Sequence, residues 1–148
     1  MSDLNTLFLS TRGRIGRRTY WLALAVLFVA NLIASLIPVI GAIAALTLLW
    51  PAACVISKRL HDMGRSSWPA IGITATSALF GLVAAVIGLL ATNPATVGVA
   101  LAMTAVPVLL GGLVALVGLA LVIWAGVAAS DAGANRYGVE TLAFPLRF

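Results

Sequence analysis

The fold is decided by the stretch from Ser66 to Ser130, which reads SSWPAIGITATSALFGLVAAVIGLLATNPATVGVALAMTAVPVLLGGLVALVGLALVIWAGVAAS. This stretch contains no Lys, Arg, Asp, Glu or His. A helix that crosses a membrane needs about 20 apolar residues, so the stretch is too long for one such helix and long enough for two. We expect the chain to turn between residues 91 and 96, because Asn93 and Pro94 are residue types that initiate turns.

A second ion-free stretch runs from Tyr20 to Ser57, and the same length argument divides it into two spans. The turn is expected around Pro38 and Gly41, which interrupt an otherwise helix-forming run. The sequence therefore predicts an all-α polytopic membrane protein, a single domain over residues 1–148 that forms a bundle of four transmembrane helices. The predicted spans cover residues 20–37, 42–57, 68–90 and 106–129.

The composition excludes an ordinary soluble domain. Charged residues make up 9% of the chain and hydrophobic residues 62%, whereas a soluble globular domain carries about a quarter charged residues. Cys54 is the single cysteine, so neither an intramolecular disulfide nor a cysteine metal cluster is available within one chain.

The charged residues predict the orientation. The four spans leave residues 1–19, 58–67 and 130–148 on one side, and all nine Lys and Arg residues fall in these segments. Basic residues accumulate in cytoplasmic loops, so we expect both termini to lie in the cytoplasm. We interpret the basic excess as a signal for topology and for anionic lipid headgroups rather than for nucleic acid.

Three short motifs interrupt the apolar sequence: GRIGRRTYW at residues 13–21, SKRLHDMGRSSW at residues 57–68 and SDAGANRYG at residues 130–138. Together they resemble the domain-of-unknown-function 805 family of small bacterial inner-membrane proteins. The resemblance implies a location in the bacterial inner membrane and implies no established reaction. The chain departs from the family pattern at Ser67, where the family often has Gly, and at Val139 and Glu140, where it often has Pro and Asp.

The candidate site combines polar residues from all three motifs. We hypothesise that they converge at headgroup level to hold an anion or an acidic partner. The alternative is that these charges anchor helix ends and brace the cytoplasmic loops against one another. The candidate binding residues are Arg14, Arg17, Arg59, His61, Asp62, Asn135 and Arg136.

The leading functional prediction is a non-enzymatic membrane component whose cytoplasmic face binds lipid headgroups or a protein partner, possessing neither a cofactor nor a metal. One alternative is a small transporter or channel that acts as a homo-oligomer, although coupled transporters usually place an ionisable group inside the membrane. Another is an interfacial enzyme for lipid or phosphate substrates with His61 and Asp62 as acid and base.

Overall fold

The computed structural model describes residues 2–138, so the predicted cytoplasmic residues Glu140 and Arg147 lie outside the described residues. Four of its helices are long and apolar enough to cross a membrane, which confirms the predicted all-α fold. The helices of the described chain are α1 (Ser2–Leu9), α2 (Arg17–Ala34), α3 (Pro38–Asp62), α4 (Trp68–Ala91) and α5 (Val97–Val127).

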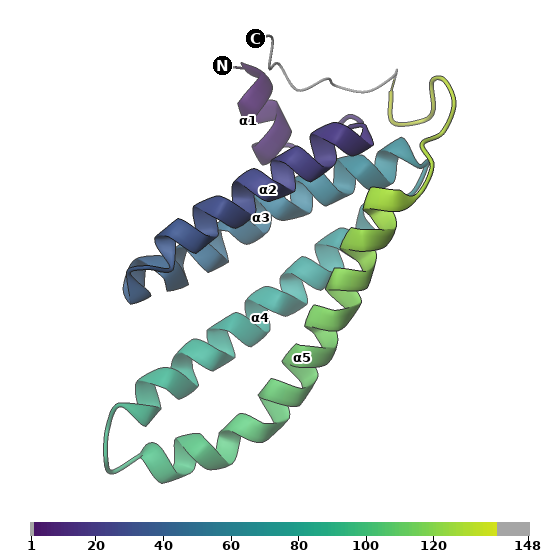
Figure 1. Ribbon diagram of the computed structural model, residues 1–148. Helices are drawn as coiled ribbons and strands as arrows, with labels where there is room; N and C mark the ends of the chain where they lie inside the picture. Colours follow the sequence, from purple (N-terminus) through teal and green to yellow (C-terminus); the bar gives the residue numbers. More distant parts are fainter. Residues whose placement is uncertain (1, 139–148) are drawn as a thin grey trace.

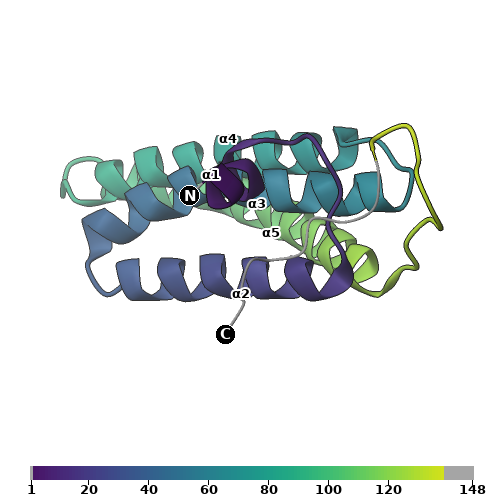
Figure 2. The ribbon, with the colours of Figure 1, turned by 90° about the horizontal axis from the view of Figure 1, so that it is seen from above.

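The four long helices form two antiparallel hairpins, α2 with α3 and α4 with α5 (Figure 1). The hairpins meet at the end of the molecule where α2 and α4 begin and α3 and α5 end, and they spread apart toward the opposite end. We call the meeting point the polar end. The short helix α1 packs on α3, and in the view of Figure 2 it lies over α3.

The first hairpin turns earlier than the sequence predicted. α2 ends at Ala34, the turn occupies residues 35–37, and Pro38 begins α3 rather than forming the turn. Proline suits the first turn of a helix because its fixed φ is helical and its missing N–H has no intrahelical partner there. Gly41 serves close packing instead: a Cβ on it would lie 2.7 Å from Cα of Ser35.

The fourth long helix begins at Val97, and the predicted start at residue 106 is wrong. The residues from 97 to 105 are mostly apolar and include helix-forming Ala, Leu and Met, and Pro107 lies inside a continuous helix. Membrane helices tolerate such a proline because neighbouring groups can satisfy the freed carbonyl. The predicted turn at residues 91–96 matches the break between α4 and α5, and α3 extends beyond the predicted span through Asp62.

Burial follows an inverted pattern. Most apolar side chains of the four long helices are exposed, whereas the described interior at the polar end contains charged groups. A soluble protein almost never buries such groups unless they are paired. Apolar surface exposed to this extent fits helices that are surrounded by lipid. The buried charged groups fit contacts that hold the helix ends together. The fully buried charged residues are Arg14, Lys58, Arg59 and Asp62.

Candidate functional site at the polar end

Arg14 connects all three motifs through one guanidinium group. Its Nε donates to Oδ1 of Asp62 at 3.1 Å. Its two terminal nitrogens donate to backbone carbonyls of the third motif, at 2.9 Å for Asp131 and 2.5 Å for Gly133. Because a guanidinium has five N–H groups in a planar fork, these internal partners occupy most of its donors. Arg14 is 2% exposed, and its guanidinium serves contacts within the protein.

Arg59 plays the corresponding role between α3 and the end of α5. It forms an ion pair with the second carboxylate oxygen of Asp62, three residues later on the same helix. Its Nε donates to the carbonyl of Ala125 at 2.8 Å, and its Nη1 also donates to the hydroxyl of Ser130 at 2.8 Å. Asp62 thus accepts from two arginines and neutralises one of two buried positive charges.

The end of α3 is shaped by Gly64. Its φ of +67° is a left-handed conformation that glycine adopts without steric cost. The N–H of Gly64 bonds to the carbonyl of His61, and the N–H of Arg65 bonds to that of Leu60, which is the Schellman helix ending. The chain then passes close to the third motif, where the N–H of Asp131 donates to the carbonyl of Asp62 at 2.8 Å.

His61 lies between the first and third motifs. Its Nδ1 is 3.3 Å from the carbonyl of Gly13 and its Nε2 is 2.6 Å from the hydroxyl of Ser67. Because a carbonyl can only accept, Nδ1 carries the proton of the neutral ring and Ser67 donates to Nε2. Tyr137 stacks on the imidazole at 3.9 Å between ring centroids. Asn135 donates to the backbone carbonyl of His61 at 2.9 Å.

Lys58 was not a candidate, yet it is fully buried. Its ammonium donates to the carbonyls of Thr6 and Leu7, at 2.7 Å for Leu7. A cation at the carboxyl end of a helix is favourable because the last carbonyls carry partial negative charge. Lys58 therefore holds α1 on α3. The sequence around Lys58 gave no signal of its contact with α1, because only the fold brings the two together.

The seven candidate residues divide into two groups. Five of them meet at the polar end, where they contact one another or the backbone: Arg14, Arg59, His61 and Asp62 are buried, and Asn135 is half-buried. The other two, Arg17 and Arg136, are exposed. Each donates one bond to a backbone carbonyl, from Arg17 to Ala128 at 3.1 Å and from Arg136 to Gly64 at 3.0 Å.

The residues that meet at the polar end connect the three motifs through contacts within the protein. The carboxylate of Asp62 is held between two guanidinium groups, so it offers no free base to a substrate. Within residues 2–138, no group of three or more His, Cys, Asp or Glu side chains could hold a metal ion.

A family model described as a protein of unknown function, DUF805, matches residues 8–139. This chain belongs to the DUF805 family. The matched range includes all three motifs and the four long helices of the described structure. No solved structure matches the chain.

Two curated relatives of this DUF805 chain come from Escherichia coli strains K12 and O157:H7, and both bear the name uncharacterized protein YiiR. Each is 39% identical over 80 residues, which cover 49% of this chain and 55% of the relative. The chain therefore spans about half the length of these relatives. The likeness supports family membership and assigns no reaction.

Proposed function

We propose that this protein is a non-enzymatic component of the bacterial inner membrane that binds anionic lipid headgroups at its polar end. In this proposal both termini and all three motifs lie in the cytoplasm, and the four long helices cross the membrane. The buried arginines hold the helix ends together, and the exposed arginines contact the lipid.

The observation that carries the proposal is the division of the arginines between interior and surface. The guanidinium groups of Arg14 and Arg59 donate to partners within the protein. The exposed ones form what we call the arginine rim: Arg12, Arg17, Arg18, Arg65 and Arg136. Each basic side chain near an anionic membrane surface contributes about 1 kcal/mol of attraction. A rim of this kind favours anionic over neutral phospholipid.

The aromatic residues support the same placement. Trp21, Trp68 and Trp124 are exposed, and each lies close to the polar-end terminus of its helix. Tryptophan is enriched at the level of the headgroups, where one side of the ring is apolar and the other is wet. The rim and these tryptophans therefore fit one interface. The positive-inside rule assigns that interface to the cytoplasmic leaflet.

The test replaces the two rim arginines at the start of α2, Arg17 and Arg18, with glutamine. The purified protein is reconstituted in nanodiscs that contain equal amounts of phosphatidylglycerol and phosphatidylcholine. Native mass spectrometry then measures how strongly the first lipid shell is enriched in phosphatidylglycerol. Two arginines at about 1 kcal/mol each predict a loss of roughly tenfold or more in this preference. The matched control replaces both residues with lysine and keeps the charge.

Four outcomes decide the proposal. Loss of the preference in the glutamine variant and retention in the lysine variant supports it. An unchanged preference in both variants contradicts it. Solute flux above that of empty liposomes would instead favour the transporter or channel alternative, and a protein that copurifies in fixed ratio and leaves when the rim is neutralised would favour a protein partner.

A further inference from the structure

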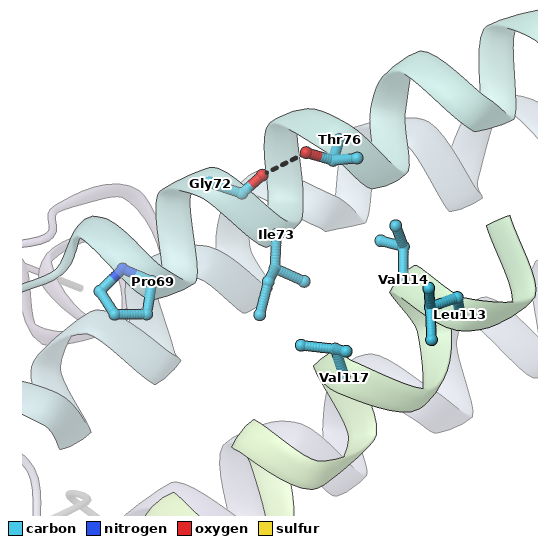
Figure 3. Close-up of a pocket in the computed structure, with 7 residues that line it drawn as sticks. All are labelled: Pro69, Gly72, Ile73, Thr76, Leu113, Val114 and Val117. Carbon is cyan, nitrogen blue, oxygen red and sulfur yellow. Dashed lines mark hydrogen bonds between the residues drawn. The ribbon is translucent and has the colours of Figure 1, made fainter. Parts of the chain in front are cut away.

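A groove in the second hairpin starts just below the polar end. It is an apolar cavity of about 480 Å³ between the first turns of α4 and the middle of α5. Figure 3 shows the side chains on its two walls, facing one another across the open space. The groove is lined by Pro69, Gly72, Ile73, Thr76, Leu113, Val114 and Val117.

The lining is chemically uniform. The only hydroxyl in it, that of Thr76, donates to the carbonyl of Gly72 at 2.9 Å, so the polar group is satisfied within its own helix (Figure 3). Nothing lies within 4 Å of a Cβ built on Gly72, so the absent side chain leaves open space on this wall. The volume falls in the range of about 300–1,000 Å³ that is usual for small-molecule sites. The groove therefore suits an aliphatic chain.

A charged residue, Arg65, lies near the end of the groove that is closer to the polar end. The guanidinium of Arg65 lies over the ring of Trp124, 5.6 Å from its centroid. On α5, Trp124 is seven residues after Val117, so it lies on the same face of the helix and about 10 Å nearer the polar end. The cation–π contact therefore holds the Arg65 guanidinium beside Trp124, on the polar-end side of the groove. Arg65 is exposed and makes no ion pair with any described residue.

We infer that the groove between α4 and α5 holds one acyl chain of an anionic glycerophospholipid whose phosphate is bound by Arg65. This site rests on the proposed function and names its ligand. The charge selects the occupant: an acyl chain gains little on moving from lipid into an apolar groove, because the two environments are equally apolar. The preference must come from the headgroup, and a lone exposed guanidinium favours a phosphate.

A second cavity on the same hairpin serves as an internal comparison. It also measures about 480 Å³ and lies further from the polar end. Its walls are residues of α4 from Phe80 to Gly88 and residues of α5 from Thr104 to Gly112. No charged residue lines it. The proposal therefore predicts selection between headgroups at the cavity next to Arg65 and none at the second cavity.

The test fills the groove without disturbing the protein. In Gly72→Leu the new side chain enters the open space that the acyl chain would occupy. The matched control is Gly98→Leu, since Gly98 is also a helical glycine with nothing within 4 Å of its Cβ and lines none of the cavities described. Thr76→Leu is a second groove-filling variant in case the first folds poorly. Circular dichroism and size-exclusion chromatography check the fold of each.

Native mass spectrometry of the full chain in detergent then follows titration with dioleoyl phosphatidylglycerol or dioleoyl phosphatidylcholine. We expect one phosphatidylglycerol to bind the wild type preferentially, and this binding to be lost in Gly72→Leu and kept in Gly98→Leu. Arg65→Gln should lower the preference for phosphatidylglycerol about fivefold. Glycerol phosphate without acyl chains should fail to compete.

Four results would overturn the inference. They are unchanged binding in both groove-filling variants, equal loss in Gly98→Leu, an unchanged preference in Arg65→Gln, and effective competition by glycerol phosphate. The last result would mean that a free phosphate ester occupies Arg65. Failure here is distinguishable from failure of the proposed function, because Arg17 and Arg18 govern the whole first lipid shell and Gly72 governs one bound lipid.

Discussion

Replacing Asp62 with asparagine tests the bracing network most severely. The side chain of Asp62 is fully buried and accepts from Nε of Arg14 at 3.1 Å and from Nη1 of Arg59. Asparagine preserves the shape, but its amide is neutral and one of its two terminal atoms is a donor. The variant therefore leaves two buried guanidinium groups without a counter-charge.

The magnitude follows from the two lost contacts. A hydrogen bond to a charged group contributes about 1.5–3 kcal/mol, so two contribute about 3–6 kcal/mol. Breaking a buried ion pair by removing one partner costs about 3–5 kcal/mol in other proteins. We therefore expect Asp62→Asn to lower the free energy of unfolding by about 3–5 kcal/mol.

The assay is equilibrium unfolding in mixed micelles of dodecylmaltoside and sodium dodecyl sulfate, followed by tryptophan fluorescence. The matched control is Asp131→Asn, which changes an exposed carboxylate whose side-chain partner is Asn135 at 3.2 Å. The control should lose less than about 1 kcal/mol because exposed charges are screened by water. A loss in Asp62→Asn no larger than that of the control would refute the argument that the buried charges hold the hairpins together.

Two further variants test single contacts at the polar end. Gly64→Ala should lower the free energy of unfolding by at least about 1 kcal/mol, because the φ of Gly64 is +67° and a Cβ there would meet the carboxylate of Asp131. The control Gly72→Ala lies in open helical space and should not lower the free energy of unfolding. Equal effects of the two variants in the same unfolding assay would contradict this account. Lys58→Met should release α1 by removing two hydrogen bonds to its last turn, which predicts roughly a hundredfold faster proteolysis within residues 2–9. Cleavage at the wild-type rate would show that Lys58 does not retain α1.

The fold was largely predictable because the bilayer imposes a simple rule of length and apolarity. The ion-free stretches gave the number of long helices and the turn near Asn93. The first turn was misplaced because Pro38 was interpreted as a turn residue, whereas the first turn of a helix accepts proline. The fourth long helix starts at Val97, before the predicted span, and contains Pro107 in its interior.

The site was predictable only in part. Arg59 and Asp62 are three residues apart, a spacing that puts two side chains on the same side of a helix, and the structure pairs them. The sequence left open whether the motifs bind a ligand or brace one another, and the interior position of Arg14 came from carbonyls more than a hundred residues away. Such partners carry no local signal, because a backbone carbonyl has the same chemistry at every residue.

The lysine at position 58 illustrates the same limit. In the sequence it stands four residues before Asp62, a spacing that suggests an ion pair on one helix face. The structure instead directs its ammonium to the carbonyls of Thr6 and Leu7. Asp62 is already engaged by two arginines, so the tertiary arrangement overrides the helical spacing.

The central claim is that the three motifs share the cytoplasmic side of a membrane crossed by the four long helices. Single cysteines introduced by Ser66→Cys, Ser130→Cys and Asn93→Cys, with the buried Cys54 replaced by alanine, test it directly. A maleimide that cannot cross membranes should label the cysteine at residue 93 in intact spheroplasts and the other two only after lysis. Labelling of residue 66 or 130 before lysis, or protection of residue 93, would contradict the claim.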